Sequence, residues 1–91
     1  MGERMKITAE ISLFPFLEKQ KGEIIKLFVD NIEKFDVFIC FGIFSTIIEG
    51  ELVEVFKAIE ESYELVCSKY PDIDLLLEQR IINREKVKGG K

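Results

Sequence analysis

The spacing of hydrophobic residues switches between two periods along this chain, and this switching restricts the possible folds more than any other feature. Near the N-terminus, apolar residues occupy every second position from Ile7 to Leu13. Alternation of this kind is typical of a strand with one buried face. Pro15 ends the run, because proline cannot donate to a strand ladder. The apolar residues that follow recur at every third or fourth position, which predicts an amphipathic helix.

The same two patterns recur in the rest of the chain. Gly42 lies between two short runs rich in β-forming residues, so we expect a hairpin there. Gly50 and Pro71 bound a second helical stripe, and the segment after Pro71 is predicted to be the last strand. The elements expected after the first strand are a helix at about residues 23–34, strands at 37–40 and 44–48, a helix between Gly50 and Pro71, and a strand at 73–82.

This β-α-β-β-α-β order predicts one small α+β domain. Right-handed crossovers would place both helices on one face of a four-stranded antiparallel sheet with strand order 4-1-3-2, the ferredoxin-like arrangement. We expect a single domain over residues 1–91, with its core at about 6–83 and a mobile basic tail at 84–91. Phe56, in the middle of the second helical stripe, is expected in the core. The other face of the sheet would remain open.

Composition and charge argue against several classes of function. The net charge of -4 does not suit a nucleic-acid partner, because phosphate binding depends on clustered lysine and arginine. The longest apolar runs are much shorter than the roughly 20 residues that span a bilayer. The sequence has no histidine, so the commonest general base and transition-metal ligand is missing. We therefore expect neither an enzyme nor a bound cofactor or metal.

The cysteines and the N-terminal segment predict a cytoplasmic protein. Cys40 and Cys67 fall on separate predicted elements without close metal-ligand spacing, so we expect free thiols in or near the core of a protein kept in a reducing compartment. Polar residues at Thr8, Glu10 and Ser12 interrupt any apolar segment that a secretory signal would need.

Polar side chains on the open face of the predicted sheet are the candidate binding residues. Glu10 lies in the middle of the first strand, and the fourth strand should bring Glu78 and Arg80 near it. One interpretation is a cross-strand ion pair between Glu10 and Arg80, worth about 0.2 to 1 kcal/mol, with the nearby hydroxyls as ordinary strand side chains. The other interpretation is a small pocket with acceptors, donors and a ring for stacking. Its ligand-binding residues would be Glu10, Ser12, Phe14, Ser45, Thr46 and Glu78.

Two segments carry a familiar pattern. The first is the run Ile-Ser-Leu-Phe-Pro at residues 11–15, and the second is Phe-Ser-Thr-Ile-Ile-Glu-Gly at residues 44–50, ahead of the pair Val55 and Phe56. Together they resemble the YkoF-like family of thiamine and hydroxymethylpyrimidine binding proteins, over about residues 8–83. The resemblance implies a ferredoxin-like fold and a ligand related to thiamine. Phe14 replaces the tyrosine usual in that family, which keeps the stacking ring and removes its hydroxyl.

The resemblance also bears on assembly. Binding members of the family carry two such domains in tandem, whereas this chain has one and resembles a single-domain member. Self-association into a homodimer or a dimer of dimers would restore the paired arrangement. An exposed apolar edge at Phe38 and Cys40 would favour the same outcome, because monomers seldom leave such a patch uncovered.

Two functional hypotheses follow from these observations. In the first, the protein is a non-enzymatic binder of thiamine or its hydroxymethylpyrimidine precursor, acting in salvage or transport. In the second, it is a structural or regulatory homo-oligomer whose open sheet face is a protein interface without a ligand. The two hypotheses differ in whether Glu10 meets a ligand.

Overall fold

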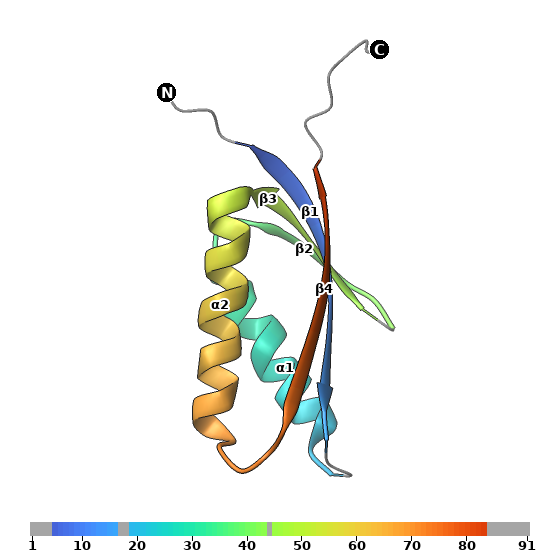
Figure 1. Ribbon diagram of the computed structural model, residues 1–91, viewed down its shortest axis with the longest axis vertical. Coiled ribbons are helices and arrows are strands. Elements are labelled where there is room, and N and C mark those ends of the chain that lie inside the picture. The colour runs from blue at the N-terminus through green and yellow to red at the C-terminus, as the bar shows by residue number, and fades with distance from the viewer. Residues whose placement is uncertain (1–4, 17–18, 44, 84–91) are drawn as a thin grey trace.

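The structure of the chain is a computed structural model that describes residues 5–16, 19–43 and 45–83. Its elements are β1 (Lys6–Pro15), α1 (Lys21–Ile32), β2 (Phe38–Phe41), β3 (Thr46–Glu51), α2 (Leu52–Lys69) and β4 (Leu75–Asn83). The predicted order of elements and the α+β class are confirmed (Figure 1). Phe44, expected to begin the third strand, and the basic tail at 84–91 lie outside the described residues.

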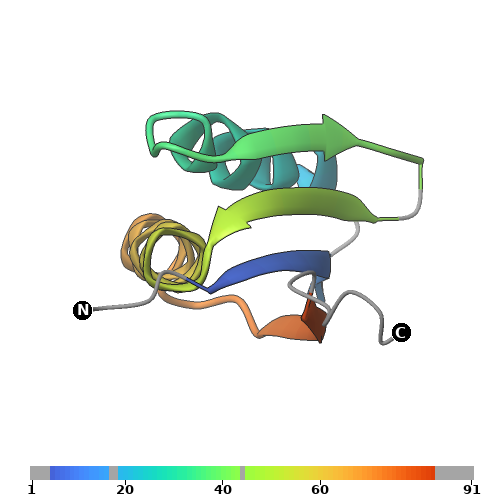
Figure 2. The same cartoon turned by 90° about the horizontal axis from the view of Figure 1, so that it is seen from above.

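The four strands form one sheet in the order β2-β3-β1-β4, which is the predicted order read from the opposite edge. Every neighbouring pair is antiparallel. Figure 2 shows α1 and α2 on the same side of this sheet. The fold is therefore consistent with the ferredoxin-like arrangement, and neither of the two described helices covers the second face of the sheet.

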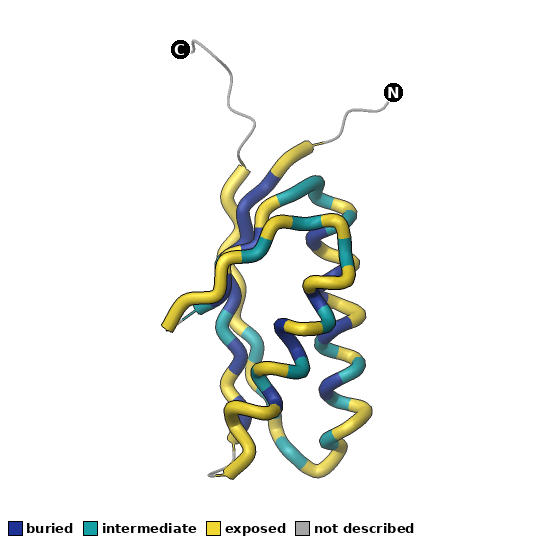
Figure 3. The backbone as a smooth tube through the Cα atoms, turned by 180° about the vertical axis from the view of Figure 1, so that it is seen from behind, coloured by how far each residue is buried: buried dark blue, intermediate teal, exposed yellow. Residues whose placement is uncertain are grey.

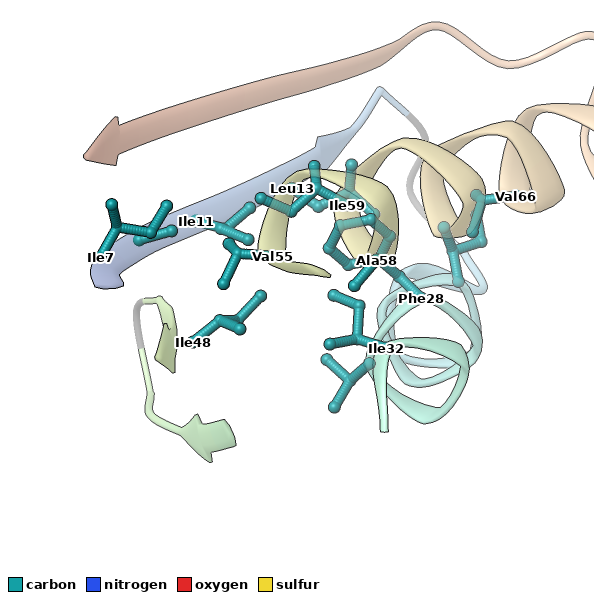
Figure 4. Packing of buried hydrophobic residues seen from close by; sticks show 13 residues of the cluster. Ile7, Ile11, Leu13, Phe28, Ile32, Ile48, Val55, Ala58, Ile59 and Val66 are labelled. Carbon is teal, nitrogen blue, oxygen red and sulfur yellow. The ribbon is translucent and has the colours of Figure 1, made fainter. Parts of the chain in front are cut away.

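The core fills the layer between the helices and the sheet. Alternate residues of β1 point toward the helices, and Ile7, Ala9 and Ile11 are almost completely buried. These side chains meet those of both helices and of β3, as Figure 4 shows. The buried cluster comprises Ile7, Ala9, Ile11, Leu13, Ile24, Phe28, Val29, Ile32, Ile48, Val55, Ala58, Ile59 and Val66. The alternation seen in the sequence therefore marks the buried face of β1.

Side-chain hydrogen bonds link α2 to α1 and to β4. Asn31 Nδ2 of α1 donates to the buried Ser62 Oγ of α2 at 3.0 Å. The Tyr63 hydroxyl donates to the main-chain oxygen of Leu75 at 2.6 Å, which ties α2 to the start of β4. Burial, followed by the nearby Cys67 thiol, raises the pKa of Tyr63. A neutral Tyr63 is the form that can donate to Leu75.

The expectation that Phe56 belongs to the core is wrong. Its side chain is 39% exposed, whereas Val55 is fully buried. A helix turns by about 100° per residue, so the side chain after a central buried residue lies on the flank of the stripe. The buried side of α2 is formed by Val55, Ala58, Ile59, Ser62 and Val66. Phe56 therefore borders the core and does not fill it.

Candidate binding site on the open sheet face

Side chains from the four strands form rows across the open face, because register partners in antiparallel strands point to the same side. One row contains Phe38, Glu49, Thr8 and Ile82, the next contains Cys40, Ile47, Glu10 and Arg80, and further rows pair Ser12 with Glu78 and Phe14 with Leu76. The polar residues are concentrated in the middle of the face. Exposed apolar side chains lie toward both ends, and Ile47 of β3 adds an apolar side chain to the row of Glu10.

The Glu10 carboxylate is oriented by a hydroxyl. Ser45 Oγ donates to Glu10 Oε2 at 3.0 Å, from the connection between β2 and β3. Arg80 lies opposite Glu10 in the register of β1 and β4. Within the described part of the chain, however, the carboxylate is bound by Ser45 and not by the guanidinium. The cross-strand ion pair, one of the two interpretations of the sequence, is therefore not formed.

Gly42 holds Ser45 in position. Its main-chain N–H donates to the main-chain oxygen of Ser45 at 2.9 Å and closes the hairpin. A Cβ atom at this position would lie 2.9 Å from the same oxygen, a separation that real side chains essentially never show. Only glycine fits this closure without a backbone shift. Figure 3 shows the end of the hairpin as an exposed segment that projects from the body of the protein.

A hollow lies beside the oriented carboxylate. Glu10 and Ser12 of β1 and Glu78 and Arg80 of β4 line it, and its volume is about 120 Å³. Ligand pockets for drug-sized molecules commonly enclose about 300–1,000 Å³, so this hollow alone can hold only part of such a ligand. Its chemistry is mixed, because two carboxylates accept hydrogen bonds and one guanidinium donates them.

A second polar contact lies at one end of the face. Thr8 Oγ1 donates to Glu49 Oε2 at 3.1 Å, next to the exposed ring of Phe38. The side chains of Phe38 and Ile82 are 79% and 49% exposed. At the other end, Phe14 and Leu76 lie opposite one another and are 42% and 43% exposed. The polar middle is thus bordered by apolar side chains that another surface could cover.

The structure brings most of the predicted site residues together. Glu10, Ser12 and Glu78 line one hollow, and Ser45 contacts Glu10 directly. Phe14 follows on the same face of β1, with its ring partly exposed. These residues lie on one face of the sheet, between the hairpin at Ser45 and Leu76 near the start of β4. Phe14 itself does not line the hollow.

Thr46 does not belong to this surface. It is 5% exposed and lies opposite Ile11, which points into the core. Successive side chains of a strand point to opposite faces, so Ser45 and Thr46 cannot both face the open side while the chain remains extended. Thr46 instead lines a second hollow, between the hairpin and α1, together with Ser12 and Ser45.

Arg80 lines the hollow but is not among the predicted binding residues. It was considered only as an ion-pair partner, but it lines the hollow with Glu10, Ser12 and Glu78. The alternation of β4 indicates the position of Arg80, because Glu78 and Arg80 are two residues apart and must share a face of the sheet. The sequence did not reveal that Ser45 would orient Glu10.

Several features bear on other classes of function. Among the described residues, no group of three or more cysteine, aspartate or glutamate side chains is placed to hold a metal ion. Neither described helix is sufficiently long and apolar to cross a membrane. Both cysteines are free thiols, but Cys40 is exposed on the open face and does not lie in the core as expected.

Comparisons with known proteins support the fold. No protein-family model matches the chain, and no curated protein matches it with a significant score. The hypothetical protein MJ1052 of Methanocaldococcus jannascii is 25% identical over 90% of this chain and 84% of its own, with a TM-score of 0.78. A domain of unknown function, DUF77, from Bacillus cereus is 15% identical over 92% of this chain and 81% of its own, with a TM-score of 0.75.

A third solved structure has a name that suggests a function. It is the Thermotoga maritima protein TM0486, which is named provisionally as a thiamine biosynthesis or salvage protein. It is 23% identical over 81% of this chain and 81% of its own, with a TM-score of 0.69. At this identity the likeness establishes a shared fold, and the name applies to that protein.

Proposed function

We propose that this protein is a non-enzymatic, cytoplasmic binder of thiamine or of its hydroxymethylpyrimidine precursor, acting in salvage or transport. The observation that carries the proposal is the Glu10 carboxylate, held by Ser45 at the edge of a mixed polar hollow on an open sheet face. The structural likeness to the Thermotoga maritima protein and the YkoF-like motifs support a ligand of this class.

The residues of the hollow suit the two halves of thiamine. An aminopyrimidine has an amine whose N–H groups donate hydrogen bonds. The carboxylates of Glu10 and Glu78 can accept these bonds. A thiazolium carries a positive charge, which is stabilised by nearby carboxylates and by an aromatic face. The partly exposed ring of Phe14 provides a surface for stacking. This combination favours a flat, nitrogen-rich cation over an anion or an apolar ligand.

A second copy of the chain would complete the site. The hollow of about 120 Å³ is smaller than ordinary ligand pockets, so a ligand bound by one copy would remain largely in water. Exposed apolar residues lie toward both ends of the open face, with Ile82 and, farther across the sheet, Phe38 at one end, and Phe14 and Leu76 at the other. Stacking a second open face on them would bury this apolar surface and enclose the ligand.

We expect a homodimer or a dimer of dimers for this reason. Light scattering coupled to size exclusion at micromolar concentration should give a mass that is a multiple of the 10.6 kDa chain. Phe38→Ser should shift the distribution toward the monomer, because it removes the most exposed ring of the open face. A protein that remains monomeric at high concentration would contradict the paired site.

The location of binding is tested by NMR. Titration of the ¹⁵N-labelled protein with thiamine should shift the amide signals of Glu10, Ser12 and Glu78. Signals from the outer side of α1, such as that of Lys26, should remain in place and serve as the internal control. Shifts confined to the helices would exclude the open face as the binding site.

The alternative is an oligomer whose open face binds no ligand. The exposed apolar residues at both ends of the face favour it, because they suit a protein interface as well as a closed pocket. Both hypotheses predict assembly. Only the binding hypothesis predicts that thiamine shifts the signals of the polar middle, so the NMR titration separates the two.

A further inference from the structure

We infer that the ligand of this site carries an anionic group beside its amine or cationic group, and that Arg80 selects for that anionic group. The inference rests on the proposed function and deepens it, because it names a phosphate ester as the class of ligand. It starts from the position of Arg80 in the hollow and from the partners of the carboxylates around it.

Among residues 5–16, 19–43 and 45–83, the Arg80 guanidinium has no carboxylate partner. It lines the hollow with Glu10 and Glu78 and lies directly opposite Glu10 in the register. Among the described residues, it nevertheless forms no ion pair with either carboxylate, and its side chain is exposed. An arginine between two acidic residues would ordinarily be expected to pair with one of them.

The geometry of the sheet accounts for this separation. Glu10 Oε2 accepts the Ser45 hydroxyl, which draws the carboxylate toward the β3 side of β1, while Arg80 lies on β4 at the other side. Glu78 and Arg80 are two residues apart on one strand face, a spacing of about 7 Å along the strand. The guanidinium therefore keeps its donors available to a ligand.

The charges of the hollow restrict the class of ligand. The planar guanidinium presents a fork of N–H donors that matches two oxygens of a phosphate. An isolated anion would be repelled by Glu10 and Glu78, which share the hollow. A ligand with both an amine or cationic group and a phosphate would satisfy the carboxylates and Arg80 together. The anionic group would approach Arg80 from the side of Ile82, which follows it on the open face away from Glu78.

This inference is tested by calorimetric titration of the full chain with thiamine, thiamine monophosphate and inorganic phosphate. We expect the monophosphate to bind roughly tenfold more tightly than thiamine, because it adds a charge-assisted hydrogen bond. Inorganic phosphate alone should bind more weakly than either. Arg80→Gln should abolish the preference, so that thiamine and its monophosphate bind with similar affinity, and Arg80→Lys should retain part of the preference.

Lys57→Gln provides the matched control, because it removes one positive charge from an exposed position on α2. It should leave the preference intact, and circular dichroism should show that every variant is folded. Equal affinities for thiamine and its monophosphate would overturn the inference while leaving the proposed function in place. A preference that survives Arg80→Gln would overturn it as well. Failure of both thiamine compounds to bind would overturn the inference together with the proposed function.

Discussion

Replacing Glu10 with glutamine is expected to lower the affinity for thiamine roughly tenfold to a hundredfold, because a charge-assisted hydrogen bond contributes about 1.5 to 3 kcal/mol. The substitution keeps the shape of the side chain and removes its charge. The amide oxygen of glutamine can still accept the Ser45 hydroxyl, which the carboxylate binds at 3.0 Å. The fold should therefore be retained, and calorimetric titration of both proteins measures the change in affinity.

Glu64→Gln is the matched control for Glu10→Gln. Glu64 is exposed on α2, on the helix side of the sheet, and its substitution removes the same charge from the molecule. It should leave the affinity for thiamine unchanged, since it alters only the long-range field. An equal loss of affinity in both variants would show that net charge, and not a contact at Glu10, controls binding. An unchanged affinity in Glu10→Gln would remove this residue from the site.

Phe28→Ala should produce the largest loss of stability among the substitutions considered for this chain. The ring is 2% exposed and lies in the cluster between α1, α2 and the sheet. Truncating a buried phenylalanine removes its transfer free energy and leaves a cavity, which together cost about 3 to 5 kcal/mol. Urea titration followed by circular dichroism measures the change in the free energy of unfolding.

Phe56→Ala is the control for this effect. The same ring is lost from α2, but 39% of it is exposed in the folded protein. Less apolar surface returns to water, and solvent can fill the space, so the loss should be less than half of that in Phe28→Ala. Equal losses in the two variants would mean that the flank of α2 is more tightly packed than its exposed fraction indicates.

The fold could be predicted from the sequence because its strongest signals are local. The alternation in β1 identifies the buried face, and the helical spacing around Phe28 and Val55 identifies the two covering helices. Right-handed crossovers then leave few topologies for this order of elements. The position of Phe56 was predicted wrongly, because a stripe of apolar residues has a flank as well as a centre.

Less of the candidate site could be predicted, because it depends on register. Glu10 and Glu78 were identified by alternation within a strand, which is a local property. The choice between Ser45 and Thr46 required the strand boundary, since β3 begins at Thr46 and buries it. The pairing of Ser45 with Glu10 joins residues 35 positions apart through the hairpin closed at Gly42. The spacing of residues in the sequence does not predict a contact between positions so far apart.

Calorimetric titration of the unmutated protein with thiamine and with hydroxymethylpyrimidine tests the central claim most directly. The binding hypothesis predicts a saturable heat for at least one of the two compounds, at a protein concentration where the oligomer is populated. Thymine, a flat pyrimidine of neutral charge without the exocyclic amine, should give no comparable heat. The absence of saturable heat with thiamine, hydroxymethylpyrimidine and their phosphates would contradict the claim and favour an oligomer whose open face binds only another copy of the chain.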